Sequence, residues 1–142
     1  MKIVLIGPTY PFRGGIAHYT TFLCKALRQN HKVKYISFKR QYPKILFPGK
    51  SDRDSSEKPL KIEGVDYIID SMNPLTWVKA ARAIKEYKPD KVIFPWWVSF
   101  WMPQFWSILI MVKRYLKSEI VFICHNVIQA GGRKTWRLFL FL

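Results

Sequence analysis

Apolar residues recur along the chain in short blocks that predict strands, and the segments between them carry helical spacing. Residues 3–6 are consecutively apolar with no polar alternation, which is typical of a strand buried on both faces of a parallel sheet. A loop punctuated by glycine and proline follows, and Gly14 and Gly15 then open a helix predicted over residues 15–28. The predicted buried stripe of that helix is Ile16, Tyr19, Thr20, Leu23 and Leu27.

The same alternation continues through the rest of the chain. Asn73 is a predicted N-cap with Pro74 at the first helical position, and the buried face of this second helix is predicted to contain Trp77, Ala80, Ala81 and Ile84. Further strands are predicted over residues 32–38, 65–70, 91–94 and 120–124, and a helix over residues 102–116. Strands and helices in alternation predict an α/β fold with a doubly wound, mostly parallel, Rossmann-like sheet.

Residues 92–112 contain no charged side chain and are nominally long enough to cross a bilayer. We nevertheless expect a strand, a loop and a helix here. Pro95 should end the strand and Pro103 lies where a helix can begin, so two prolines interrupt the run.

Residues 1–142 are predicted to form one domain, interrupted by a basic and polar flexible loop at residues 40–61. This loop is either a solvated linker or an electrostatic arm or lid. Residues 133–142 begin another helical pattern whose apolar surface needs a packing partner.

The charge balance narrows the classes of partner. Lys and Arg number 24 against 9 Asp and Glu, giving a formal net charge of +15, which favours nucleic acid, a phosphate-bearing substrate or an acidic membrane surface. Nucleic acid is not expected, because no helix-turn-helix, zinc or RNA-binding signature is present. Cys24 and Cys124 lie in apolar stretches and are predicted to be buried free thiols in a reducing, cytoplasmic compartment. The chain shows no signal-peptide pattern, and its histidines and cysteines lack metal-ligand spacing, so neither secretion nor a metal site is expected.

In a doubly wound sheet, ligands bind beyond the carboxyl ends of the strands. Gly14 and Gly15 lie at such an end, where backbone N–H groups at a helix N-terminus can approach a phosphate, although the spacing matches neither the dinucleotide fingerprint nor a Walker loop. A plain strand-to-helix turn is the alternative. His18, in the first helical turn, either touches a ligand or is a surface histidine.

Polar and aromatic residues follow the other predicted strands. His125 and Asn126 can hold sugar hydroxyls, or serve as a cap or turn. Cys124 and His125 are not expected to act as a nucleophile and base couple, because neighbouring strand side chains point to opposite faces. Asp70 could orient a hydroxyl or cap the next turn, and as a lone carboxylate it does not indicate a two-carboxylate hydrolase.

Trp96 and Trp97 could stack on a sugar ring, favour a membrane headgroup zone, or pack in the core. Further aromatic residues follow closely: Phe100, Trp101 and Trp106. Core packing is expected to explain some of the five.

Together, the glycine turn, the tryptophan pair and the His-Asn pair resemble the N-terminal domain of a family 4 glycosyltransferase of GT-B architecture. The matching residues are the strand at 3–6 with Phe-Arg-Gly-Gly-Ile at 12–16, Phe-Pro-Trp-Trp at 94–97, and Phe-Ile-Cys-His-Asn-Val at 122–127. The resemblance implies sugar transfer from a nucleotide-sugar substrate with retention of configuration, without a cofactor or metal. Gly15 would then offer its N–H to the diphosphate, Gly14 would permit the turn, and His125 would contact the transferred sugar as the catalytic residue. A carbohydrate or lipid-linked acceptor would lie against Asp70, Trp96, Trp97, Asn126 and His18.

The chain departs from the family pattern in two respects. Residues 128–132 replace a Pro-His-Glu-like segment, and the second, donor-binding domain of a GT-B enzyme is missing from the sequence. We therefore expect a fragment that is inactive alone and peripheral on the inner face of a membrane. The alternative is a non-catalytic acceptor-binding or membrane-docking subunit that is completed by a separate donor-binding chain.

Overall fold

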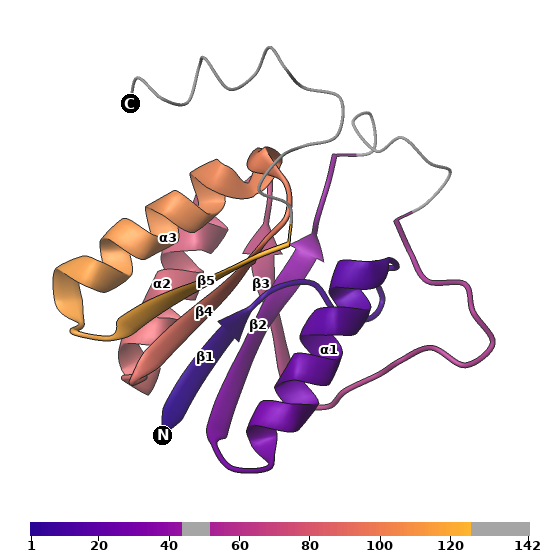
Figure 1. Ribbon diagram of the computed structural model, residues 1–142. Coiled ribbons are helices and arrows are strands. Elements are labelled where there is room, and N and C mark those ends of the chain that lie inside the picture. The colour runs from indigo at the N-terminus through magenta and orange to yellow at the C-terminus, as the bar shows by residue number, and fades with distance from the viewer. Residues whose placement is uncertain (44–51, 126–142) are drawn as a thin grey trace.

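The computed structural model describes residues 1–43 and 52–125, which form one five-stranded parallel sheet flanked by helices (Figure 1). The strand order is β3-β2-β1-β4-β5, so the N-terminal strand is central. In chain order the elements are β1 (Lys2–Ile6), α1 (Gly15–Arg28), β2 (Lys32–Arg40), β3 (Val65–Asp70), α2 (Pro74–Tyr87), β4 (Lys91–Trp96), the 3-10 turn η1 (Ser99–Trp101), α3 (Met102–Tyr115) and β5 (Glu119–Cys124). The predicted α/β, Rossmann-like fold is confirmed.

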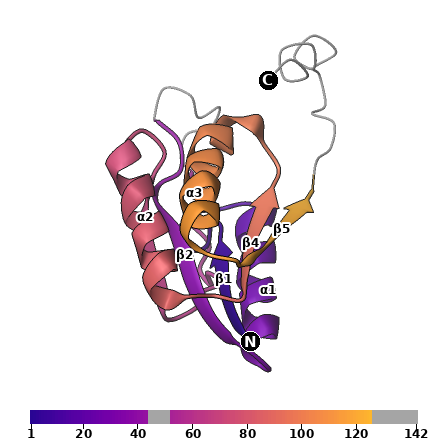
Figure 2. The ribbon, with the colours of Figure 1, turned by 90° about the vertical axis from the view of Figure 1, so that its left-hand side faces the viewer.

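The sheet is covered on both faces, with α1 on one side and α2 and α3 on the other (Figure 2). Successive side chains of β1 point to opposite faces of the sheet, because side chains alternate along a strand. Ile3 and Leu5 pack in the cluster beneath α1, whereas Val4 and Ile6 pack beneath α2 and α3. This two-sided burial explains the uninterrupted apolar run of β1.

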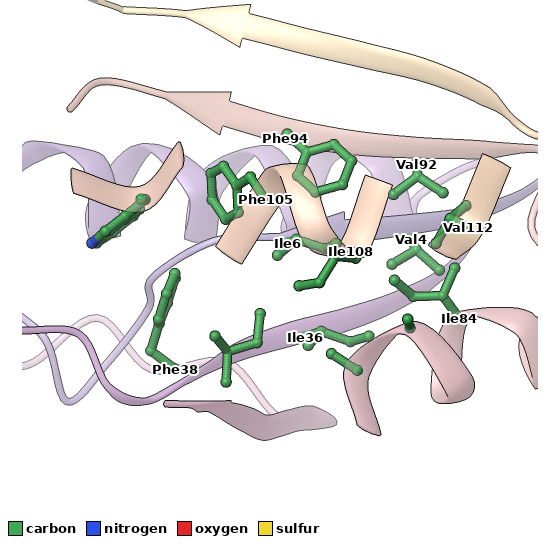
Figure 3. Close-up of a cluster of buried hydrophobic side chains, with 14 of the residues drawn as sticks. Val4, Ile6, Ile36, Phe38, Ile84, Val92, Phe94, Phe105, Ile108 and Val112 are labelled. Carbon is green, nitrogen blue, oxygen red and sulfur yellow. The ribbon is translucent and has the colours of Figure 1, made fainter. Parts of the chain in front are cut away.

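The larger core lies between the sheet and the pair α2 and α3 (Figure 3). Phe94 of β4 meets Phe105 of α3 edge-on, with ring centroids 5.2 Å apart. The predicted helix cap is also confirmed, because the Asn73 side chain accepts a hydrogen bond from the N–H of Leu75 at 3.1 Å. The predicted buried face of α2 is confirmed as well, with three fully buried members, Ala80, Ala81 and Ile84, and Trp77 partly buried.

The stripe that α1 buries differs from the predicted one. Of the predicted set, Thr20 is buried and Tyr19 is exposed, whereas Ile16, Leu23 and Leu27 are partly buried, the last two against the cluster beneath α1. The buried residues of α1 are Ala17, Thr20, Thr21 and Cys24. The helix turns its small side chains to the sheet because it approaches closely: a Cβ added at Gly7 would lie 3.0 Å from Thr20 Cγ2.

The uncharged run over residues 92–112 forms strand, turn and helix, as predicted, but Pro95 does not end the strand. It pairs in register with Ile123 of β5, and β4 continues to Trp96. The ladder with β1 stops earlier, at Leu5 and Ile93, so the missing N–H of Pro95 removes no bond from that side. Within the two described ranges, no helix combines the length and apolarity needed to span a membrane.

The prediction of two buried thiols is half wrong. Cys24, on the inner face of α1, is fully buried, but Cys124 is exposed, as is Phe122. Both exposed residues belong to β5, which is an edge strand of the described sheet and therefore has a neighbouring strand on one side only.

Part of the connection between β2 and β3 is fixed against the loop that follows β1. Phe12 and Arg53 form an antiparallel bridge, and the N–H of Arg13 donates to Asp52 O at 2.9 Å. The Arg53 guanidinium also lies 4.9 Å from the Phe12 ring centroid. Residues 44–51 of the predicted flexible loop lie outside the described residues.

Candidate functional site

The carboxyl ends of β1, β4 and β5 meet where the strand order reverses direction, which is the ligand-binding position of open α/β sheets. From β1 the chain passes through α1 to β2 on one side, whereas β4 joins the opposite side of β1. The glycine turn before α1 and the residues after β4 and β5 therefore come to one edge of the sheet.

Gly14 and Gly15 play different structural roles at this edge. Gly14 precedes α1 with φ 113° and ψ 164°, a backbone region that is essentially restricted to glycine. Gly15 begins the helix, and a Cβ added at either glycine would meet no heavy atom of the described residues within 4 Å, apart from its chain neighbours and the helix backbone. Among the described residues, the first turn has no acidic residue and no side-chain cap, so its N–H groups and the positive end of the helix dipole have no side-chain acceptor there. This geometry suits an anionic group.

A network of buried hydroxyl groups holds the loop between β1 and α1. Tyr35 donates from its hydroxyl to Pro8 O at 2.7 Å, and Thr20 donates to the same carbonyl. Beside them, the hydroxyls of Thr9 and Thr21 are 2.7 Å apart. Sequence reasoning missed this network; its only signal was the unusual presence of threonine on the buried side of a helix. The network positions the turn from beneath without using the N–H groups at the start of α1.

His125 lies beside the N-terminal half of α1. Its backbone N–H donates to Trp96 O at 2.8 Å, which continues the ladder between β5 and β4 by one residue. Its ring makes an edge contact with Tyr19 of α1, with centroids 4.3 Å apart. The buried Nε2 atom has no hydrogen-bond partner in the described part of the chain. The structure thus brings His125 and the start of α1 together, and Asn126 lies outside the described residues.

The predicted tryptophan pair lies on the other side of the sheet. Trp96 and Trp97 are partly buried and pack against the cluster beneath α2 and α3. Trp97 meets the buried Trp101 with ring centroids 3.6 Å apart. Burial raises the pKa of the neighbouring Tyr42, although hydrogen bonds with Trp97 and Gln41 oppose the shift.

These aromatic residues therefore divide between two environments. Trp101 belongs to the core and stacks near Phe38, whereas Trp106 is exposed on α3. Core packing explains Trp101 and does not explain Trp106.

Asp70 lies at the opposite, β3 edge of the sheet and is not brought near His125. Arg40 at the end of β2 grips it with two hydrogen bonds of 2.8 Å, one to each carboxylate oxygen. The N–H of Met72 donates to the same carboxylate at 2.9 Å. Asp70 thus joins two strand ends and orders the turn into α2, while its carboxylate is already engaged by donors of the protein.

His18 is exposed on α1 and faces the connection between β2 and β3. The hydrogen bond from the N–H of Ser56 lowers the pKa of Asp54, and the nearby His18 lowers it further. The N–H of Asp54 donates in turn to Pro11 O at 2.8 Å. Residues 52–56 therefore form a polar rim beside the glycine turn, a feature that the sequence placed within an unassigned loop.

Comparison with known proteins adds no family to these observations. No protein-family model matches the chain. No curated protein matches it either. The described residues define a Rossmann-like α/β domain with an anion-compatible helix terminus beside a histidine.

Proposed function

We propose that this chain is the acceptor-side domain of a GT-B glycosyltransferase of family 4, which transfers a sugar from a nucleotide-sugar substrate with retention of configuration. The observation that carries the proposal is the contact between His125 and Tyr19 in the second turn of α1, which brings the histidine at the end of β5 to the N-terminal half of that helix. A diphosphate and the sugar attached to it require these two features to be neighbours.

In this proposal the backbone of Gly15 and the dipole of α1 stabilise the negative charge that develops on the leaving diphosphate. His125 would hold a hydroxyl of the transferred sugar through its Nε2 atom, which is buried and for which the described residues supply no partner, so a small movement of the ring would have to expose it. Catalysis then depends on positioning and charge stabilisation by the chain's own residues.

The remaining predicted residues have separate places in the proposal. The acceptor would be bordered from two sides of the strand ends. On one side is His18, beside the rim at residues 52–56, and on the α3 side are Trp96 and Trp97. Asp70 would act on an acceptor only if the ion pair with Arg40 opened. A GT-B enzyme needs two Rossmann-like units, and these residues form one, so the donor pocket proper belongs to a second unit, supplied by the same polypeptide or by a separate chain.

The test is a titration of the 15N-labelled chain with nucleoside diphosphates and nucleotide sugars, followed by NMR. Binding to half of a donor site is weak, and chemical shifts report it where calorimetry does not. We expect the largest shift changes at the amides of Gly15, Ile16 and His125, with much smaller changes for inorganic phosphate. Shift changes scattered over other surfaces, or none at these amides with any nucleotide, would contradict the proposal.

A matched pair of variants separates the site from the rest of the helix. Gly15→Val places a bulky side chain in the open space before the helix N-terminus, where no other atom lies within 4 Å of its Cβ. Gln29→Val places the same side chain at the exposed C-terminal end of α1. The proposal requires the first variant to lose the nucleotide response and the second to keep it.

A further inference from the structure

The outer faces of α2 and α3 carry exposed apolar residues that the core does not explain. Both helices cover the same face of the sheet and pack against each other (Figure 2). Leu75 is 78% exposed and Trp106 is 60% exposed, which are large values for such side chains. The exposed apolar group consists of Met72, Leu75, Val78, Trp106 and Ile110.

Basic side chains follow the apolar ones on both helices. On α2, Leu75 and Val78 are succeeded by Lys79, Arg82 and Lys85, and on α3, Trp106 and Ile110 are succeeded by Lys113 and Arg114. All five cations are exposed. No carboxylate in the described part of the chain forms an ion pair with any of them. The exposed Glu86 nevertheless lines the same groove as Lys79 and Arg82, so the local charge there is two cations against one carboxylate. Lys113 donates to Ser118 O at 3.3 Å, and Lys85 lies 4.0 Å from the centroid of the Tyr115 ring.

The two helices run in the same direction, so their apolar and basic halves coincide. Helices that connect parallel strands run antiparallel to them, and the beginning of α3 lies at the end where the strand arrows point (Figure 1). The apolar half therefore lies at the same edge of the sheet as the glycine turn and His125. The basic half lies toward the opposite edge.

We propose that this outer face of α2 and α3 docks on an anionic lipid surface, so that the acceptor is a lipid-linked molecule presented from the bilayer. Tryptophan and aliphatic side chains partition into the interfacial zone of a bilayer, and flanking cations attract acidic headgroups. A soluble acidic protein would match the cations but not the exposed apolar half. The orientation tilts the carboxyl edge of the sheet toward the membrane. The statement about the acceptor rests on the proposed function, whereas docking itself does not.

Co-sedimentation of the full chain with vesicles tests the docking surface. Phosphatidylcholine vesicles are compared with vesicles in which a third of the lipid is phosphatidylglycerol, at low and high salt. We expect binding to the acidic vesicles that weakens with salt. Combined Lys79→Gln, Arg82→Gln and Lys113→Gln substitutions should weaken it about hundredfold, since each cation near an acidic surface contributes about fivefold.

The control removes the same charge elsewhere. Lys25, Lys39 and Lys58 are exposed and lie outside the outer face of α2 and α3. Their combined replacement by glutamine gives the same net charge as the first triple variant. Equal losses in the two triple variants would mean attraction by net charge alone and would overturn the proposed surface.

A second matched pair tests the apolar half. Trp106→Ser should weaken vesicle binding about tenfold, because an exposed indole gains most from the interface. Phe22 on α1 is equally exposed, at 60%, and faces the opposite side of the sheet. Phe22→Ser should leave binding unchanged, and circular dichroism checks that both variants are folded.

Other occupants of this face give distinct results. A chain that elutes as a dimer, and becomes monomeric on Trp106→Ser, would show that a second copy covers the face, and the proposal would fail. Absence of binding to either vesicle type would also overturn it. No nucleotide is present in these experiments, so the two proposals are tested independently. Vesicle binding can be absent while the nucleotide response at Gly15 persists, and vesicle binding can be present while the nucleotide response is absent.

Discussion

Alanine at Gly14 and alanine at Gly15 should change the stability of the domain in opposite directions. The two glycines are adjacent, and a Cβ at either position would lie in open space. Steric contact with the rest of the protein therefore cannot separate the two variants. The backbone conformation does separate them, because Gly14 has φ 113° and ψ 164°, whereas Gly15 is the first residue of α1.

The expected sizes follow from these conformations. An L-residue held in the region occupied by Gly14 costs on the order of 1–3 kcal/mol. Gly15→Ala should instead raise the free energy of unfolding by about 0.4–1 kcal/mol, because alanine lowers the conformational entropy of the unfolded chain and fits a helix. The two variants should thus differ by about 1.4–4 kcal/mol, with wild type between them.

Urea unfolding followed by tryptophan fluorescence and circular dichroism measures this difference. With an m-value of about 2 kcal/mol/M, the two midpoints should be about 0.7–2 M apart. Equal effects of the two substitutions, or a more stable Gly14→Ala variant, would refute the assignment of the positive φ angle to Gly14. An unchanged m-value in both variants is the control that the transition is the same.

Three further predictions concern the interior. Gly7→Ala should destabilise by about 1–3 kcal/mol, because its Cβ would lie 3.0 Å from Thr20 Cγ2, and a double-mutant cycle with Thr20→Ser should recover part of that loss in urea unfolding. A thiol reagent should label Cys124 rapidly and Cys24 only after unfolding, since burial also raises the pKa of Cys24; rapid labelling of both would contradict the packing of α1. Burial raises the pKa of Tyr35 as well, so the folded state keeps a proton that the unfolded state loses above about pH 10. The free energy of unfolding should therefore fall as the pH rises above about 10, and it should fall less steeply in Tyr35→Phe. Urea unfolding midpoints measured at several pH values test this.

Local signals in the sequence predicted the elements well. Asn73 followed by Pro74 marks a helix start through interactions within a few residues, and the structure has that cap. The predicted strand at residues 65–70 has the same bounds as β3. The fold class followed because alternating strands and helices have few ways to pack.

Features that depend on strand order were not predictable from the pattern. Pro95 remains in β4 because the ladder with β1 ends two residues earlier, at Ile93. Asp70 is paired with Arg40 because β2 and β3 are neighbours. Cys124 is exposed because β5 is an edge strand of the described sheet. Each of these facts requires the spatial order of the strands, which one sequence does not contain.

The candidate site was predicted in part. Gly14, Gly15 and His125 were all selected by the strand-end rule, and the structure brings the histidine to the start of α1. Hydrophobicity predicted the buried stripe of α1 only in part: Leu23 and Leu27 do pack against the core, but the more apolar Tyr19 was chosen over Thr21 and is exposed. Close approach to the sheet favoured the smaller side chain, which also completes the hydroxyl network.

The central position of β1 has a consequence for how the chain folds during synthesis. β1, α1 and β2 are contiguous and can associate as soon as they leave the ribosome. The other edge of β1 must wait for β4: the N–H of Lys2 donates to the Asp90 carboxylate across 88 residues of chain. Until then an apolar strand edge stays open, so a nascent chain halted before β4 should bind chaperones that recognise extended apolar segments.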